Sequence, residues 1–287
     1  MKSRQIWQTL FRFRKTNVNE MCVLTLINKA LHERTQLGST VLVNLGCGSR
    51  WRTDWINIDF HGDNNNVFAH NLRKGLPLPD ASVDCIYSSH CIEHFTPHDA
   101  EKFLRECVRV LKPSGLLRIA VPDLEEIARA YLAALDAARA AANNETAAAK
   151  HEWMIIELVD QLCRHQGGGE MLRLWVQPGE VPAEDFIISR MGTEYLNARK
   201  HCKGMELPPP STDPLHVGTF RLGGEPHQWM YDELSLSRLL CRCGFTGVQR
   251  MDATSSRLDG FVRYCLDTNG DGSVYKPESF YMEAWFA

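Results

Sequence analysis

The feature that most constrains the fold is the regular alternation of short apolar runs with turn or helical segments between residues 41 and 121. Five runs have the length and composition of buried strands, and they lie at Val41–Leu45, Trp55–Phe60, Val67–His70, Val83–Ser88 and Leu116–Val121. Strands that alternate with helices usually form a mostly parallel sheet with right-handed crossovers. The sequence therefore predicts an α/β fold.

A second group of signals lies near the end of the chain. Asp232 can cap a helix that ends at Gly244, and Phe245–Met251 and Ser279–Phe286 have the composition of strands. A helix, a strand, a long connection and a final strand are typical of a terminal hairpin. We therefore predict that the last strand runs antiparallel to the rest of the sheet.

The stretch between these two groups has a different pattern. Residues 124–143 and 150–165 have the composition of helices, whereas residues 172–226 contain many prolines and are predicted to be irregular. We interpret residues 124–225 as a helical and loop insertion over the carboxyl edge of the sheet. Ligands bind at that edge in open α/β sheets, so the insertion would act as a substrate cap.

The overall charge and composition exclude several classes of protein. The net charge of −3 over 287 residues lacks the basic excess of a nucleic-acid-binding protein. No apolar run reaches the roughly 18–20 residues that span a membrane. Arg12, Arg14 and Lys15 interrupt the stretch where a secretory signal would be apolar. The ten cysteines do not have disulfide-framework spacing, which favours reduced thiols and a cytoplasmic location.

The first residues, 1–37, are predicted to form an amphipathic helical segment. Trp7, Leu10, Phe11 and Phe13 lie among basic residues in this segment. We expect it to pack on the core as a lid. The alternative is weak peripheral attachment to an anionic membrane surface.

A glycine-rich turn, Gly46–Cys47–Gly48, follows the first predicted strand. Glycine lets the backbone approach a bound ligand closely. The third glycine of a dinucleotide-binding fingerprint is absent, because Trp51 holds its position, and this counts against NAD. Asp59 ends the second strand, where its carboxylate could accept hydrogen bonds from both hydroxyls of a ribose. Asn71 follows the third strand and could reach an adenine amino group.

Five segments in order resemble successive motifs of the type-11 class I S-adenosylmethionine-dependent methyltransferases: Val41–Gly48, Trp55–Asp59, Leu76–Asp80, Val83–His94 and Arg109–Gly115. The resemblance is close over residues 40–123 and looser over residues 226–287. It implies a Rossmann-like core made of residues 38–123 and 226–287. It also implies that S-adenosylmethionine is the cofactor.

The resemblance further implies a role for each matching position. Gly46, Cys47 and Gly48 would support the methionine part of the cofactor, and Asp59 would hold its ribose. Asn71 and Leu72 would lie by the adenine, and Ser88, Ser89 and His90 under the methionine end. Two residues depart from the family pattern, since Asn44 and Asn71 stand where acidic residues are usual. The short spacing after Gly48 also predicts that the usual first helix is short or missing.

Methyl transfer to a hydroxyl group benefits from a general base, because a protonated hydroxyl is a poor nucleophile. His90 directly follows the fourth strand and is the first candidate, and His94 is the second. Either residue could instead be a packed side chain behind the site. A metal-binding stripe of His90, His94 and His98 is not favoured, because acidic ligands with suitable spacing are missing. Asp123, just after the fifth strand, is expected to act on the acceptor.

The insertion supplies candidates for acceptor binding. Asp160, Gln161 and Arg164 share one helical face, which could equally be a solvated surface. This stretch and the segment from His227 through Tyr231 to Asp232 resemble parts of methyltransferases from bacterial polysaccharide and lipopolysaccharide clusters. That resemblance implies O-methylation of a sugar or glycan-like hydroxyl.

Other interpretations of the function stay open. They are N- or C-methylation of another small metabolite, and a methyltransferase-like binding protein without turnover. The oligomeric state is also open, with a homodimer as one option. Asp267–Gly272 with Glu278 fits a calcium loop, but a hairpin turn explains the same residues. We therefore predict no resident metal.

Overall fold

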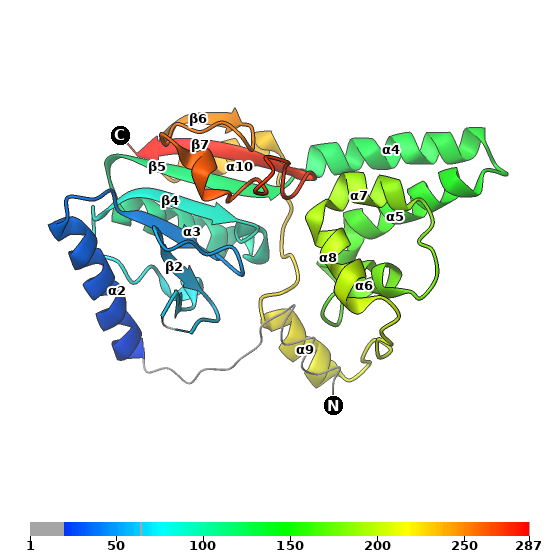
Figure 1. Ribbon diagram of the computed structural model, residues 1–287, viewed down its shortest axis with the longest axis horizontal. Helices are drawn as coiled ribbons and strands as arrows, with labels where there is room; N and C mark the ends of the chain where they lie inside the picture. The colour runs from blue at the N-terminus through cyan, green and yellow to red at the C-terminus, as the bar shows by residue number, and fades with distance from the viewer. Residues whose placement is uncertain (1–19, 64, 287) are drawn as a thin grey trace.

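The computed structural model describes residues 20–63 and 65–286. A sheet with its packed helices forms one part of the molecule, and a helical lobe forms the other (Figure 1). The seven strands have the order β3-β2-β1-β4-β5-β7-β6. Their bounds are β1 Leu42–Leu45, β2 Ile56–Asp59, β3 Val67–Ala69, β4 Val83–Ser89, β5 Leu111–Pro122, β6 Phe245–Met251 and β7 Ser279–Phe286.

The strand directions confirm the predicted fold class. β1 pairs in parallel with β2 and β4, and β5 pairs in parallel with β4. β7 is antiparallel to both β5 and β6. All four residues of β1 are buried, as expected for a central parallel strand that is covered on both faces. The fold is therefore α/β, with a Rossmann-like, mostly parallel sheet and an antiparallel last strand.

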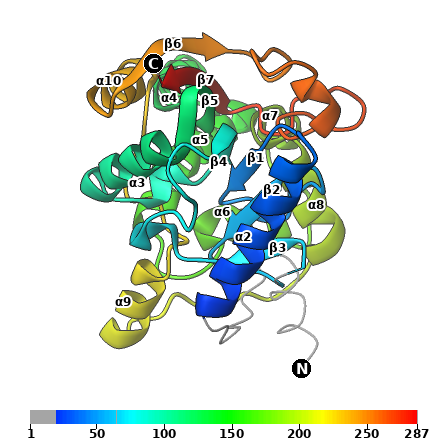
Figure 2. The ribbon, with the colours of Figure 1, turned by 90° about the vertical axis from the view of Figure 1, so that its left-hand side faces the viewer.

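One face of the sheet is covered by α2 (Glu20–Gln36), α3 (Pro97–Val110) and α10 (Glu233–Arg242). Figure 2 shows α2 crossing the β2–β3 side of the sheet. Their apolar side chains form one core with the strands, which includes Ile27, Phe103, Leu104, Leu236, Val43 and Ile58. As predicted, Asp232 caps α10, where its carboxylate accepts a hydrogen bond from the Ser235 amide at 2.7 Å.

The opposite face lacks the helix that would normally follow the first strand. Residues 46–55 form only turns, which confirms the prediction of a short or missing helix. The connection between β6 and β7 covers this face instead. Phe261, Tyr264 and Leu266 from this connection pack on Trp55 and Tyr87 in a separate apolar cluster.

Two arginines tie the turn after β1 to that connection. Arg50 donates hydrogen bonds to the backbone oxygens of Leu266 at 3.1 Å and Thr268 at 2.6 Å, and also to that of Cys265. Arg52 bonds the backbone oxygen of Cys265 at 2.7 Å. The β6–β7 connection therefore takes the place of the missing helix. Its backbone oxygens hold the turn after β1 in position through the two arginines.

A row of polar side chains crosses the same face of the sheet. Adjacent strands place Asn57, Asn44, Tyr87, Arg118 and Glu283 in register with one another. Arg118 is 1% exposed and bonds Glu283 at 2.9 Å. A buried charge is tolerated in a protein when it is paired and hydrogen-bonded. The buried charge of Arg118 is paired in this way, and its second partner is a residue of the β6–β7 connection.

That residue is Asp267, the first position of the possible calcium loop. Its carboxylate accepts hydrogen bonds from Arg118 Nε at 2.7 Å and from the Tyr87 hydroxyl at 2.5 Å. The loop closes as a hairpin, with the Asn269 amide bonded to the Ser273 oxygen at 2.8 Å. Asp267 is thus used to hold the connection on the sheet, which supports the hairpin interpretation of the loop.

The helical lobe begins where β5 ends. The two predicted helices are present as α4 (Leu124–Ala140) and α5 (Glu145–Cys163). The prediction that residues 172–226 are irregular is wrong, because they contain most of α6 (Gly169–Val176) and all of α7 (Glu184–Met191), α8 (Thr193–Cys202) and α9 (Pro214–Leu222). Glycine and proline mark helix starts here: Gly168 precedes α6 with φ +77°, and Asp213 with Pro214 begins α9.

The lobe has its own apolar core. Trp153, Trp175 and Tyr195 are 0–4% exposed within it, and the rings of the two tryptophans stack with their centroids 6.0 Å apart. None of the described helices is both long and apolar enough to cross a membrane. Trp7, Leu10 and Phe11 lie outside the described residues.

The buried Arg118 network should dominate local stability. Arg118→Ala would leave the carboxylates of Asp267 and Glu283 buried without their cation, so we expect a loss of about 3–5 kcal/mol in the free energy of unfolding. Denaturant unfolding measures this loss. Arg105→Ala is the matched control, because it breaks an exposed pair with Glu101 that is worth about 1 kcal/mol or less. Equal losses in the two variants would contradict this account.

Candidate functional site

The carboxyl ends of the parallel strands meet at one edge of the sheet. β5 ends at Pro122 and leads directly into α4 of the lobe, so this edge faces the lobe (Figure 1). The lobe also contacts the edge through α8. There the Thr193 hydroxyl accepts a hydrogen bond from the side-chain amide of Asn269, in the β6–β7 connection, at 2.9 Å. The predicted cofactor residues lie at or near the ends of β1, β2, β3 and β4, at or beside this edge.

The turn after β1 has two glycines with different surroundings. Gly46 has φ +70°, and a Cβ there would lie 2.6 Å from the Cys91 sulfur. Gly48 has φ +50°, and no described atom would lie within 4 Å of a Cβ added to it. Its amide donates a hydrogen bond to Asp59 Oδ2 at 2.9 Å. Gly46 is therefore packed from behind by Cys91, while the backbone at Gly48 is open for a ligand to approach.

Cys47, between the two glycines, is buried, and burial together with the Asp59 charge raises the pKa of its thiol. Asp59 ends β2 beside this turn, and its Oδ1 also accepts a hydrogen bond from the His61 amide at 3.2 Å. Asn71 caps the short helix η1 (Leu72–Lys74) by accepting a hydrogen bond from the Arg73 amide at 3.0 Å. Leu72 is buried beneath this turn.

Asn44 stabilises the turn after β1 by hydrogen bonds on the face of the sheet that the β6–β7 connection covers. Its side-chain amide donates to the backbone oxygen of Arg50 at 3.2 Å and to Asn57 Oδ1 at 3.3 Å. An aspartate at this position could only accept hydrogen bonds, so it could not make either contact. This gives a physical reason for the departure from the acidic residue of the family pattern.

β4 ends with Ser88 and Ser89 at the same edge. Ser88 is 1% exposed, and its hydroxyl has no hydrogen-bond partner among the described residues. Ser89 is half-buried and pairs in register with Ala120 of β5. Ser88 thus leaves an unsatisfied hydroxyl next to the glycine turn.

His90 follows β4 with φ +49°, and its ring lies within the protein. Its Nε2 is 2.8 Å from the Ser279 hydroxyl, and its Nδ1 is 3.3 Å from Glu93 Oε1. Burial lowers the pKa of the ring well below its usual value, and the Lys276 charge lowers it further. Because both ring nitrogens are engaged, the geometry favours a positioning role for His90 over the predicted role as base.

Glu93 is a site residue that the sequence analysis missed. Its side chain is 0% exposed, and burial raises the pKa of its carboxyl. Its backbone oxygen accepts hydrogen bonds from the Gln228 and Trp229 amides at 2.7 and 3.2 Å. These bonds bring His227 beside His94, with ring centroids 4.9 Å apart. His98, by contrast, is exposed and lies outside this group.

Asp123 lies at the junction of β5 and α4, where its carboxylate contacts other parts of the protein. Its carboxylate caps α4 by accepting a hydrogen bond from the Glu126 amide at 3.2 Å. The other oxygen accepts one from Arg250 Nη2 at 2.8 Å. Both oxygens therefore bind protein groups, and the contacts are those of a buried helix cap rather than of a group that faces an acceptor.

The predicted acceptor-binding face of α5 is an internal anchor in the structure. Asp160 accepts hydrogen bonds from Arg164 at 2.8 Å and from the Glu170 amide at 2.7 Å. Arg164 also pairs with Glu225 at 3.3 Å, and the Gln161 backbone oxygen accepts the His227 amide at 2.9 Å. These contacts hold the segment that carries His227 against the lobe.

Tyr231 lies further along this segment and is 3% exposed. Its backbone oxygen accepts a hydrogen bond from the Leu124 amide at 2.9 Å. Its hydroxyl has no hydrogen-bond partner within the part of the chain that the structure describes. Tyr231 therefore resembles Ser88 in leaving an unsatisfied hydroxyl inside the protein.

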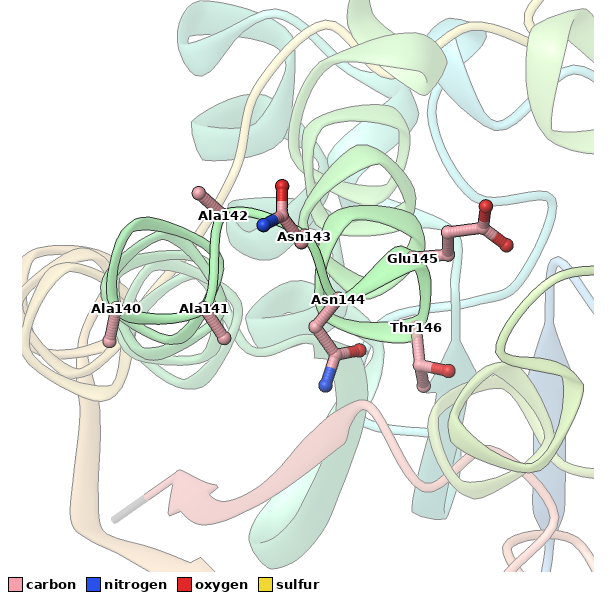
Figure 3. Close-up of a pocket in the computed structure, with 7 residues that line it drawn as sticks. All are labelled: Ala140, Ala141, Ala142, Asn143, Asn144, Glu145 and Thr146. Carbon is pink, nitrogen blue, oxygen red and sulfur yellow. The ribbon is translucent and has the colours of Figure 1, made fainter.

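A surface hollow lies elsewhere, at the turn between α4 and α5. It is lined by the consecutive residues 140–146, of which the side chains are small or polar (Figure 3). The turn is at the far end of these helices from the sheet (Figure 1). None of the candidate site residues lines it.

Comparison with known proteins agrees with this geometry. Residues 59–119 match the family model of a methyltransferase domain. The match begins at Asp59, the last residue of β2, and covers β3, β4 and most of β5, including the residues that follow β4. The matched stretch includes Asp59, Asn71 and the residues from Ser88 to His94, whereas the glycine turn and the helical lobe lie outside it.

Two curated relatives match over similarly short stretches. A probable S-adenosylmethionine-dependent methyltransferase of Mycobacterium tuberculosis is 52% identical over 57 residues, which are 20% of each chain. A ubiquinone/menaquinone biosynthesis C-methyltransferase of Vibrio cholerae is 42% identical over 59 residues, which are 20% of this chain and 22% of that protein. The chain therefore spans about a fifth of the length of these relatives.

Among solved structures, an S-adenosylmethionine-dependent methyltransferase from Archaeoglobus fulgidus is similar, with 13% identity and a TM-score of 0.37. The similarity covers 90% of this chain and 94% of that one.

The packing of Gly46 leads to a stability prediction. Gly46→Ala would place a Cβ against Cys91 and force alanine into a left-handed conformation, so we expect a loss of about 2–5 kcal/mol in the free energy of unfolding. Gly38→Ala is the control, because Gly38 has φ +62° and open surroundings. It should lose only the conformational part, about 1–2 kcal/mol. Denaturant unfolding compares the two, and a smaller loss for Gly46→Ala would refute the packing argument.

Proposed function

We propose that this protein transfers a methyl group from S-adenosylmethionine to a hydroxyl oxygen of a sugar or glycan-like acceptor. The observation that carries the proposal is the hydrogen bond from the Gly48 amide to Asp59, beside an open stretch of backbone. It joins the glycine turn to the acidic end of β2 at the edge where open α/β sheets bind ligands. The methyltransferase-domain match, which starts at Asp59, supports the same assignment.

The residues present fit this cofactor. Gly48 allows close approach, Asp59 can accept hydrogen bonds from ribose hydroxyls, and the unsatisfied Ser88 hydroxyl lies next to the turn. The turn that receives the cofactor would be shaped by Gly46, Cys47 and Asn44. The edges of the cofactor site would be formed by Asn71, Leu72 and Ser89. When bound, the cofactor supplies a methyl group that is already activated on a sulfonium. The protein must then mainly position the acceptor.

The acceptor side of the site is polar, which favours a hydroxyl-rich acceptor. Several buried polar atoms here have no hydrogen-bond partner among the described residues, and they belong to Glu93, His227, Tyr231 and Glu278. Burying such groups unsatisfied is costly, and hydroxyl groups of an acceptor would satisfy them. Because the acceptor oxygen must also lose its proton, Glu93, His94 and His227 are better placed than His90 to assist that step.

We propose that residues 124–225 act as the substrate cap. Lys276, in the β6–β7 connection at the sheet edge, pairs with Glu194 of α8 at 3.1 Å. This pair adds to the Thr193–Asn269 contact in holding the lobe over the edge. A lobe at that position would exclude water around the reacting groups.

C-methylation is the second candidate. The observation that favours it is the relative from Vibrio cholerae, which is described as a C-methyltransferase. A quinone-type acceptor is largely apolar, so it would leave the unsatisfied polar atoms near Glu93 without partners. The buried polar atoms near Glu93 therefore favour O-methylation of a polar acceptor over C-methylation of an apolar one.

Cofactor binding can be tested by calorimetry with S-adenosylmethionine and S-adenosylhomocysteine. Both should bind, and Asp59→Ala should weaken binding about 10- to 150-fold, because hydrogen bonds to a charged group are worth about 1.5–3 kcal/mol. Asp54→Ala is the control, since it removes an exposed carboxylate just before β2. Unchanged affinity in Asp59→Ala would argue against the assignment, and a lack of binding by the unaltered protein would exclude methyl transfer.

The acceptor can be sought with methyl-labelled cofactor and mass spectrometry of the products. We expect label in nucleotide sugars or oligosaccharide extracts, and none in apolar quinone precursors. Label on a ring carbon of a quinone precursor would favour the second candidate. A protein that binds the cofactor but labels nothing across both sets would fit a binding protein without turnover.

A further inference from the structure

Three side chains that can bind metals converge between the sheet edge and the segment before α10. Ligand atoms of Glu93, His94 and His227 all lie within 4.8 Å of one another. We propose that these residues bind a divalent transition-metal ion, with zinc as the best match. The histidine stripe considered from the sequence is a different set, because it lacks Glu93 and His227 and includes the exposed His98.

Polar atoms of Glu93 and His227 are buried and have no hydrogen bonds from described residues. Glu93 is 0% exposed, and neither of its carboxylate oxygens accepts a hydrogen bond from a described residue. His227 is 3% exposed, and its Nδ1 likewise has no partner there. His90 Nδ1 lies 3.3 Å from Glu93 Oε1, which leaves the second carboxylate oxygen and His227 Nδ1 without a contact of this kind. Burying such polar atoms is costly, and a cation between the two side chains would satisfy them.

Neighbouring groups orient the proposed ligands. His94 Nδ1 lies 3.4 Å from the Pro226 backbone oxygen, which leaves Nε2 as the free nitrogen. His90, held by Ser279, directs its Nδ1 at Glu93 from 3.3 Å. Metal-binding histidines usually donate their second N–H to a carbonyl or carboxylate, and metal-binding carboxylates are themselves contacted in this way.

Several acidic side chains lie around one lysine near the proposed ligands. Three acidic side chains, Glu93, Glu194 and Glu278, interact electrostatically with one lysine, Lys276. Lys276 forms its ion pair with Glu194 at 3.1 Å. Lys276 is thereby occupied, and no lysine or arginine pairs with Glu93 among the described residues, so a divalent ion would stabilise its buried carboxylate.

The ligand set selects the type of metal. Two histidines and one glutamate are a known catalytic zinc set that leaves a position open, and they also suit non-haem iron. Magnesium prefers oxygen ligands and is disfavoured. Zinc–nitrogen bonds of about 2.0–2.1 Å place ligand atoms roughly 3.3 Å apart, so binding would draw the three side chains together by about an ångström or more.

An ion at this position would lower the pKa of an acceptor hydroxyl bound to it. That role rests on the proposed function and would replace the general base expected at His90. Metal binding itself does not depend on methyl transfer, so the two can be tested separately.

The test uses the full chain purified without a histidine tag. Elemental analysis by mass spectrometry should find about one zinc per chain, and chelator-stripped protein should recover it from added zinc chloride. Glu93→Gln and His227→Ala should each reduce retained zinc at least tenfold, while the exposed control His98→Ala should keep it. Full zinc retention in both ligand variants would overturn the site.

Cobalt substitution keeps the test decisive if a variant fails to fold. Cobalt added to the stripped, unaltered protein should give visible d–d absorption without an intense sulfur-to-cobalt charge-transfer band. Such a band would place the metal at cysteines and overturn the proposal, as would the absence of any zinc or cobalt binding. Calorimetry with S-adenosylmethionine on the same sample separates the outcomes, because loss of cofactor binding with metal retained would count only against the proposed function.

Discussion

The arrangement of the site depends on the buried ion pairs of Arg118 with Asp267 and Glu283. Arg118 lies on β5, Glu283 on β7 and Asp267 in the connection between β6 and β7, so one guanidinium joins three segments. This connection covers the face that the missing helix leaves bare. Because its backbone oxygens hold Arg50 and Arg52, the glycine turn after β1 is positioned by contacts that begin at Arg118.

The two sides of the sheet edge have different chemistry as a result. On the β1–β2 side, backbone amides and Asp59 form a turn suited to a nucleoside and its attached groups. On the β4–β5 side, residues 90–94 meet the segment around His227, and polar atoms there are buried without partners. The lobe reaches this second side through Thr193 and Glu194. Group transfer requires space for a cofactor on one side and for an acceptor on the other.

The strands could be predicted because each is a short apolar run bounded by turn residues, and buried parallel strands have that pattern. The glycine turn and Asp59 followed from strand order, since parallel strands bring their carboxyl ends to one edge. The helices α6–α9 could not be recognised, because they are short and glycine or proline stands where several of them begin. The contacts of Asp123 could not be predicted, because its partner Arg250 is distant in sequence. Glu93 was missed because only the folded chain brings His227 beside it, although its position next to His94 was a usable signal.

The most direct test of the central claim is a crystal structure of the protein with S-adenosylhomocysteine. The account predicts the nucleoside at the carboxyl ends of β1 and β2, with its ribose hydroxyls on Asp59 and its amino-acid part along Gly46–Gly48 toward Ser88. Density for the compound at any other place, or a ribose that makes no contact with Asp59, would contradict it.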